Sequence, residues 1–201
     1  MIYCARRGNK NGSAAVYELL EHAYRVEHGG GLPGIKRSFH GKPYFPEHPG
    51  VHFSLSHAMR HVLCALSGSP VGCDIESPRE LSDRALEYFS TPEELSLFEP
   101  LELWVLKESY VKLYGRTVAS IRGLRFTRGG GEIILAEGQF SGDPGAHDGP
   151  GAEISCGYGA KEGRFPATAN RPPVFKLFKI CDCRAAVCGQ SEDLPDSVIF
   201  V

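Results

Sequence analysis

The chain has 201 residues, which is enough for one sizeable domain or for two small halves that share a core. Hydrophobic residues make up 42% and charged residues 23%, as in an ordinary soluble globular protein. The formal net charge of -2 gives no reason to expect nucleic acid or a charged membrane surface as a partner. The sequence has no apolar run near the roughly 20 residues that cross a bilayer and no apolar secretory core at its start, so a cytoplasmic protein is expected.

The first part of the chain indicates one helix and three strands. Apolar residues recur at helical spacing over residues 13–25, with Ser13 as the expected N-cap. Residues 51–57 alternate between apolar and polar side chains, as a half-buried strand does. Residues 61–66 are apolar on both faces and therefore predict a buried strand. We expect this strand to form a hairpin with residues 71–76, because a short Gly-Ser-Pro turn separates them.

The rest of the chain indicates a second set of helices and strands. Thr91, Pro92 and Glu94 have the arrangement of a capping box, which predicts the start of a helix. The strongest helical pattern covers residues 101–114. Residues 138–173 are rich in Gly and Pro and predict a long loop. Further strands are expected at residues 124–128 and 133–135, joined as a hairpin by the glycines at 129–131, at residues 174–180 and 184–188 as a second pair, and at residues 197–201. A helix followed by strands therefore recurs in each half.

Three carboxylates form a candidate metal site. Asp74 and Glu76 are two residues apart, so on a strand their side chains lie on the same face. Two carboxylates held together repel each other unless they are protonated or a cation lies between them. Glu108, from the helix at 101–114, would complete a set of hard oxygen ligands, for which magnesium is the natural ion. The spacing of Glu108 and Lys112 is equally compatible with an exposed ion pair between residues i and i+4.

A short basic stretch precedes the first of these strands. It contains Lys36, Arg37, His40 and Lys42, the last of them within Gly41-Lys42-Pro43. Lysine binds phosphate as a point charge and arginine as a planar fork, whereas runs of charge are commonly solvated loops. The pattern therefore leaves a phosphate clamp and an ordinary surface loop open.

The cysteines and histidines indicate no zinc site. None of the seven cysteines forms a C-x-x-C pair, and a reduced protein with structural thiols is expected. Cys181 and Cys183 would share a face of a strand, but two thiols are a weak ligand set. His57 and His61 have the spacing of zinc ligands on a helix. The pattern around them is a turn and then a strand, which would separate their side chains.

Four motifs, taken in chain order, resemble those of the Sfp-type 4′-phosphopantetheinyl transferases. They are Gly41-Lys42-Pro43, Phe53-Ser-Leu-Ser56-His57, Val71-Gly72-Cys-Asp74-Ile-Glu76, and Trp104-x-x-Lys107-Glu108-Ser109-x-x-Lys112 followed by Gly115. The last two together are the signature of that family. The resemblance covers residues 14–135, with weaker similarity in the strands from Val174 onward, and Ser54 stands where many members have asparagine.

This resemblance implies a fold and an activity. The implied fold class is α+β, with two similar α/β halves that form an intramolecular pseudo-dimer. Residues 1–70 would bind the nucleotide of coenzyme A, and residues 71–201 would carry the magnesium site and the catalytic helix. The family transfers the 4′-phosphopantetheine group of coenzyme A to a serine of an apo acyl or peptidyl carrier protein and releases adenosine 3′,5′-bisphosphate. Two halves in one chain imply a monomer.

The resemblance also implies a role for each matched residue. Asp74, Glu76 and Glu108 would hold magnesium against the pyrophosphate of coenzyme A. Glu108 would in addition activate the carrier serine, and Lys112 would contact the pyrophosphate or assist the leaving group. The residues implied for binding coenzyme A are Lys42, Ser56 and His57, with His57 at the 3′-phosphate, and Lys36, Arg37, Arg6 and Arg7 are further candidates for the nucleotide phosphates.

Two functions of other classes remain open. The chain could be a non-catalytic module that binds carrier proteins, although the presence of all three carboxylates disfavours this. It could also be an unrelated metal-dependent phosphoester hydrolase, which would release phosphate without modifying a carrier. The sequence does not specify which carrier protein would be the substrate.

Overall fold

The computed structural model describes residues 1–138, 172–190 and 194–201. Most of the predicted loop at 138–173 therefore lies outside the described residues. Of the helices within these ranges, none is both long and apolar enough to cross a membrane. The elements are β1 (Ile2–Arg6), α1 (Gly12–His28), β2 (Lys36–Arg37), β3 (Pro43–Tyr44), β4 (His52–His57), β5 (His61–Ser67), β6 (Val71–Glu76), α2 (Asp83–Phe89), α3 (Pro92–Leu97), α4 (Pro100–Leu113), a 3₁₀ helix η1 (Val118–Gly123), β7 (Arg125–Gly129), β8 (Glu132–Glu137), β9 (Val174–Ile180), β10 (Cys183–Gly189) and β11 (Ile199–Phe200).

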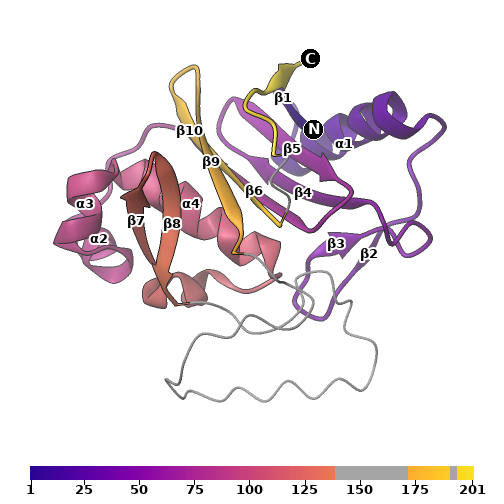
Figure 1. Cartoon of the computed structure of the whole chain (residues 1–201). Coiled ribbons are helices and arrows are strands. Elements are labelled where there is room, and N and C mark those ends of the chain that lie inside the picture. Colours follow the sequence, from indigo (N-terminus) through magenta and orange to yellow (C-terminus); the bar gives the residue numbers. More distant parts are fainter. Residues whose placement is uncertain (139–171, 191–193) are drawn as a thin grey trace.

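Helices and sheets stack in four layers, which gives the α+β class that the sequence predicted (Figure 1). Helix α1 packs on one face of a four-stranded sheet of order β11-β1-β5-β4. The other face of that sheet packs on a three-stranded sheet of order β6-β10-β9, and α4 covers the far side of the second sheet. The layers explain why β5 is apolar throughout, since it is buried between α1 and the second sheet.

Strand β6 separates apolar from acidic side chains. Val71, Cys73 and Ile75 point into the core between the two sheets. Asp74, which alternates with them, lies on the opposite face of the strand, toward α4. The side chains of β6 therefore alternate between the two faces of the strand, as the sequence predicted.

The two sheets meet along β4 and β6, where side chains supply the hydrogen bonds. The amide nitrogen of Cys73 donates to the hydroxyl of Ser54 at 2.9 Å, and that of Ile75 donates to the hydroxyl of Ser56 at 3.3 Å. The two hydroxyls act in place of the carbonyl oxygens of a neighbouring strand. They accept hydrogen bonds from amide groups on the edge of β6 that would otherwise be buried without an acceptor.

The predicted hairpin of β5 with β6 is wrong. Strand β5 is a central strand, paired along one edge with β1 and along the other with β4. It therefore has no free edge for β6, which instead pairs with β10. The turn between β5 and β6 carries the chain from one sheet to the other.

Most of the other local predictions are confirmed. The hairpins β7–β8 and β9–β10 form where expected, and Thr91 and Glu94 make the predicted capping box. The N-cap of α1 is Asn11 rather than Ser13, because the Asn11 side chain accepts the amide of Ser13. The last strand, β11, lies parallel to β1 at the edge of the first sheet.

Candidate active site

Two elements bring the three predicted carboxylates toward one another. Asp74 on β6 is 5% exposed, Glu108 on α4 is 8% exposed, and Glu76 is half-buried. Gly72 permits this approach, since a Cβ at that position would clash with the backbone of Ser109 and of the last turn of α4. Strand β6 can therefore lie directly against α4 with acidic side chains at the contact.

The two oxygens of Asp74 have different surroundings. Oδ1 accepts hydrogen bonds from the hydroxyl of Ser56 and from Nζ of Lys112, both at 2.7 Å. Within the described residues, Oδ2 of Asp74 and Oε1 of Glu108 are buried without a hydrogen-bond partner. A buried carboxylate oxygen without a donor is costly. A hard cation would satisfy both oxygens, so these residues fit magnesium.

The side chains around Asp74 also shift one another's protonation. Burial, and then the charge of Asp74, raise the pKa of Glu108 to about 7, while Lys112 opposes the rise. Burial and Asp74 also raise the pKa of Glu76, and Arg79 works against them. Burial, the largest single influence, would lower the pKa of Lys112, but the attraction of Asp74, Cys73 and Glu108 together outweighs it and the pKa is raised. Lys112 therefore stays protonated at neutral pH, and its positive charge offsets the repulsion between the neighbouring carboxylates.

The carboxylate oxygens of Asp74, Glu76 and Glu108 lie farther apart than the ligands of a single ion do. Asp74, Glu76 and Glu108 do not form a group whose ligand atoms all lie within 4.8 Å of one another. Among the described residues, such a group lies near the turn between β9 and β10. The oxygens of Asp74, Glu76 and Glu108 are spread more widely. Lys112 meanwhile compensates the charge of Asp74 at 2.7 Å.

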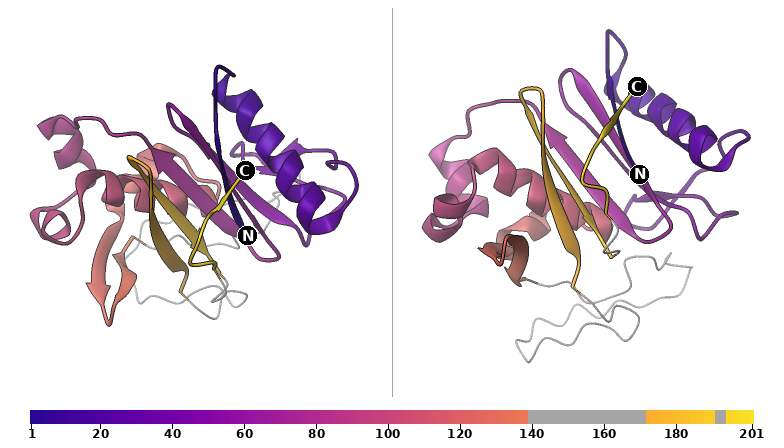
Figure 2. Two further views of the ribbon diagram at one scale, coloured as in Figure 1. Left: turned by 90° about the horizontal axis from the view of Figure 1, so that it is seen from above. Right: turned by 45° about the horizontal axis from the view of Figure 1, so that its top comes forward.

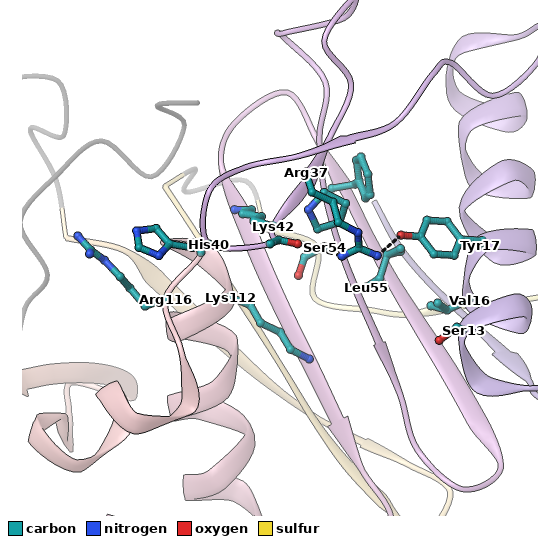
Figure 3. Close-up of a pocket in the computed structure, with 14 residues that line it drawn as sticks. Ser13, Val16, Tyr17, Arg37, His40, Lys42, Ser54, Leu55, Lys112 and Arg116 are labelled. Atoms are coloured by element: carbon teal, nitrogen blue, oxygen red, sulfur yellow. Dashed lines mark hydrogen bonds between the residues drawn. The ribbon is translucent and has the colours of Figure 1, made fainter. Parts of the chain in front are cut away.

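A pocket of about 290 Å³ opens between α1 and the end of α4 (Figure 3). The guanidinium of Arg37 is held there by two hydrogen bonds, one to the hydroxyl of Tyr17 at 3.1 Å and one to the carbonyl of Gly41 at 2.9 Å. Basic residues from two stretches of chain, 37–42 and 112–116, line this space, which suits a ligand with several phosphate groups. Those that line the pocket are Arg37, His40, Lys42, Lys112 and Arg116.

Two residues implied for coenzyme A binding lie at the junction between the sheets. Lys42 lines the pocket, but its Nζ donates to the carbonyl of Leu113 at 2.6 Å and to that of Val71 at 3.3 Å. Burial lowers the pKa of Lys42 to about 8. Ser56 is buried beside Asp74 and donates to it. Both therefore contact the framework of the site, and their contacts with coenzyme A stay a prediction.

The other residues implied for coenzyme A lie nearer to α1. The ring of His57 sits against the first turn of α1, where a Cβ on Gly12 would lie 2.9 Å from it. Arg37 lines the pocket, as described above, whereas Lys36 is exposed on β2 and does not line it. Arg6 and Arg7 also lie outside the pocket lining.

The sequence reasoning missed the role of Lys107, which lies within the helix motif. Lys107 is fully buried and forms an ion pair with Glu94 at 2.9 Å. Its Nζ also donates to the carbonyls of Phe89 and Leu124. Glu94 accepts the amide of Phe126 at 2.9 Å while completing its capping box. The pair therefore fixes α4 relative to α3 and β7. The sequence signals for these residues were the helix motif, which contains Lys107, and the capping box, which contains Glu94, and neither indicated that the two side chains meet.

Comparisons with known proteins agree with the motifs. A model of the 4′-phosphopantetheinyl transferase superfamily matches residues 70–140, which include β6, α4 and all three carboxylates. The resemblance to that superfamily is confirmed. The 4′-phosphopantetheinyl transferase of Bacillus subtilis is 35% identical over 115 residues, and 4′-phosphopantetheinyl transferase Sfp of Bacillus subtilis strain 168 is 36% identical over 87 residues.

A third relative, 4′-phosphopantetheinyl transferase gsp of Aneurinibacillus migulanus, is 33% identical over 92 residues. The matched regions cover 52%, 38% and 41% of this chain and 50%, 39% and 38% of the three relatives, in the order given. The chain thus spans about half, or less, of the length of the superfamily members that it matches.

Proposed function

We propose that this protein transfers the 4′-phosphopantetheine group of coenzyme A to a serine of an apo acyl or peptidyl carrier protein and releases adenosine 3′,5′-bisphosphate. The observation that carries the proposal is that Asp74 and Glu76 of β6 lie close enough to Glu108 of α4 for their charges, in addition to burial, to raise its pKa. Both motif segments lie within the range that the superfamily matches.

Asp74, Glu76 and Glu108 are proposed to hold magnesium. Bound magnesium would compensate the negative charge of a pyrophosphate group beside these side chains. The unpartnered oxygens of Asp74 and Glu108 support this proposal, since they are the atoms that a cation would satisfy. Ser56 and Lys112 orient the carboxylate of Asp74 through its other oxygen.

Glu108 is proposed to accept the proton of the carrier serine, directly or through a water molecule. Burial and the charge of Asp74 raise its pKa to about 7 without a metal, and bound magnesium would lower it, so Glu108 would be ionised at neutral pH and able to accept a proton. Lys112 is positively charged and lines the pocket, so it is placed to offset the charge of the leaving phosphate. The basic pocket beside Arg37 is proposed to take the nucleotide phosphates of coenzyme A.

The wider organisation expected from the resemblance is also proposed. Each sheet is covered by one long helix, and β6, which begins the second sheet, starts at Val71. This supports an intramolecular pseudo-dimer divided into residues 1–70 and 71–201, and a monomeric enzyme. The described cysteines are all free, which supports a reducing, cytoplasmic location.

A mass measurement tests the proposed activity. Purified protein, coenzyme A and magnesium are incubated with a panel of apo carrier proteins from fatty acid, polyketide and nonribosomal peptide pathways. The expected result is a mass gain of one phosphopantetheine arm on at least one carrier, greatly reduced in Glu108→Gln. Glu21→Gln, an exposed glutamate of α1, is the matched control and should be active.

Two results would contradict the proposal. No mass gain across the panel, with Glu108→Gln indistinguishable from wild type, would favour a binding module without catalysis. Release of phosphate from coenzyme A without modification of any carrier would favour a phosphoester hydrolase.

A further inference from the structure

A second cluster of potential metal ligands, made of residues other than the three carboxylates, lies where the two sheets meet at their tips. It comprises His61, Asp182 and Cys183, and one ligand atom of each lies within 4.8 Å of the other two. His61 begins β5 in the first sheet, whereas Cys183 begins β10 in the second sheet. The tips of the β4–β5 and β9–β10 hairpins lie near each other in the right-hand view of Figure 2, and the contact between His61 and Cys183 links them.

Two of the three distances within this cluster are those of a tetrahedral metal site. Sγ of Cys183 lies 3.6 Å from Nδ1 of His61 and 3.6 Å from Oδ1 of Asp182. Zinc binds sulfur at about 2.3 Å and nitrogen or oxygen at about 2.0–2.2 Å, so two such ligands at a tetrahedral angle lie about 3.6 Å apart. Both distances therefore match the separation expected between two ligands of a tetrahedral zinc ion.

The surroundings of the cluster suit a structural ion. His61 is 4% exposed and Cys183 is 1% exposed, so two ligands are held in place by packing. Asp182 is exposed in the turn between β9 and β10, which leaves a path for an ion to enter. A water molecule can supply the fourth ligand of a tetrahedral ion.

The ligand types decide which class of ion would bind. One thiol, one imidazole and one carboxylate form a mixed set that is softer than the all-oxygen set of Asp74, Glu76 and Glu108. Magnesium has little affinity for sulfur or imidazole, whereas zinc and cobalt bind all three ligand types. The two clusters therefore select different cations.

We propose that His61, Asp182 and Cys183 form a tetrahedral site for zinc or a similar divalent transition metal, which links the two sheets at their tips. Polar contacts among the described residues there include a hydrogen bond from the amide of Met59 to the hydroxyl of Ser77, at 3.0 Å, and a contact of 3.9 Å between that hydroxyl and Sγ of Cys183. A bound ion adds a direct connection between β5 and the β9–β10 turn and stabilises the stacked sheets. This proposal does not rest on the proposed transferase activity.

Titration with cobalt tests the site directly. The full chain is stripped with a chelator, kept reduced, and titrated with Co²⁺ in excess magnesium, which occupies the carboxylates. The expected result is one Co²⁺ per chain, with a thiolate charge-transfer band in the near ultraviolet and the visible absorption of tetrahedral cobalt, both removed by zinc. Zinc at 100 times its Kd should also raise the Tm of the wild type by roughly 5–10 °C.

Variants assign the absorption to the cluster. Cys183→Ser should abolish the charge-transfer band, and Asp182→Asn should weaken cobalt binding by at least about tenfold. Asp182 lies in an exposed turn, so this variant stays informative even if Cys183→Ser folds poorly. Glu108→Gln, which alters the other cluster, should leave the band unchanged.

Two results would overturn the proposal, namely the absence of a thiolate band in the wild type and its persistence in Cys183→Ser. In the second case, Cys181→Ser identifies the thiol responsible. Loss of the band in Cys181→Ser would then mean that the exposed thiol of Cys181 binds cobalt without the cluster.

Discussion

Replacement of Glu108 by glutamine is expected to stabilise the metal-free protein at alkaline pH and to abolish its stabilisation by magnesium. Glu108 is 8% exposed and has a pKa raised to about 7, first by burial and then by the charge of Asp74. An acidic group whose pKa is higher in the folded state than in the unfolded state binds its proton more tightly in the folded state. The free energy of unfolding of the wild type should therefore fall as the pH rises from about 4.5 to about 7. Above that range the contribution of Glu108 should not change further.

The size of the effect follows from the pKa. A rise from 4.5 to about 7 corresponds to at most about 3 kcal/mol in the free energy of unfolding. Solvent screening and local relaxation are expected to reduce this to about 1.5 kcal/mol. Glutamine occupies nearly the same volume and stays neutral, so Glu108→Gln avoids this loss. Magnesium should reverse the order at pH 8, because it binds the ionised Glu108 of the wild type and stabilises the folded state.

Urea denaturation at pH 5 and pH 8, with chelator or with magnesium, measures these differences. With chelator, Glu108→Gln should gain about 1.5 kcal/mol over the wild type between pH 5 and pH 8. With magnesium at pH 8, the wild type should gain stability and Glu108→Gln should gain much less. Glu21→Gln should follow the wild type under all four conditions. Identical pH dependence of wild type and Glu108→Gln in chelator would refute the reasoning, as would equal stabilisation of both by magnesium.

Three further substitutions probe the framework and the pocket. Lys107→Met should lower the free energy of unfolding by about 3–5 kcal/mol in urea, because it leaves Glu94 buried without its partner, and a loss below about 1 kcal/mol would contradict the pairing. Gly72→Ala should cost about 3 kcal/mol or more, because its Cβ would meet the backbone of α4. Gly68→Ala, with open space around it, is the thermal-unfolding control, and a similar Tm for both variants would disprove the close contact. Arg37→Ala should raise the KM for coenzyme A about tenfold with little change in kcat, since it removes charged donors from the pocket, and an unchanged KM would place the phosphates elsewhere.

The local patterns of the sequence were sufficient for most of the elements. Alternation along a strand depends on adjacent residues, so it placed Asp74 and the apolar side chains of β6 on opposite faces without further information. The capping box at Thr91 and the glycine turn between β7 and β8 are equally local. These features form in the structure as predicted because each is specified within a few residues of chain.

The pairing of strands required the tertiary structure. Strand β5 was expected to pair with β6 because the two are neighbours in sequence, but its edges are taken by β1 and β4. Competition for an edge depends on segments far apart in the chain. The hydroxyls of Ser54 and Ser56, which bond to the edge of β6, are likewise found only once the sheets are stacked.

The sequence by itself therefore determined the ligand types of the candidate site and the elements that carry them, and its motifs indicated that Glu108 would join Asp74 and Glu76. Only the tertiary structure decided their surroundings. Lys112 contacts Asp74 across 38 residues of chain, and Lys107 is buried against Glu94. His61 meets Cys183 across 122 residues. Burial and charge in such contacts depend on how distant segments pack, and the spacing of residues along the chain does not contain that information.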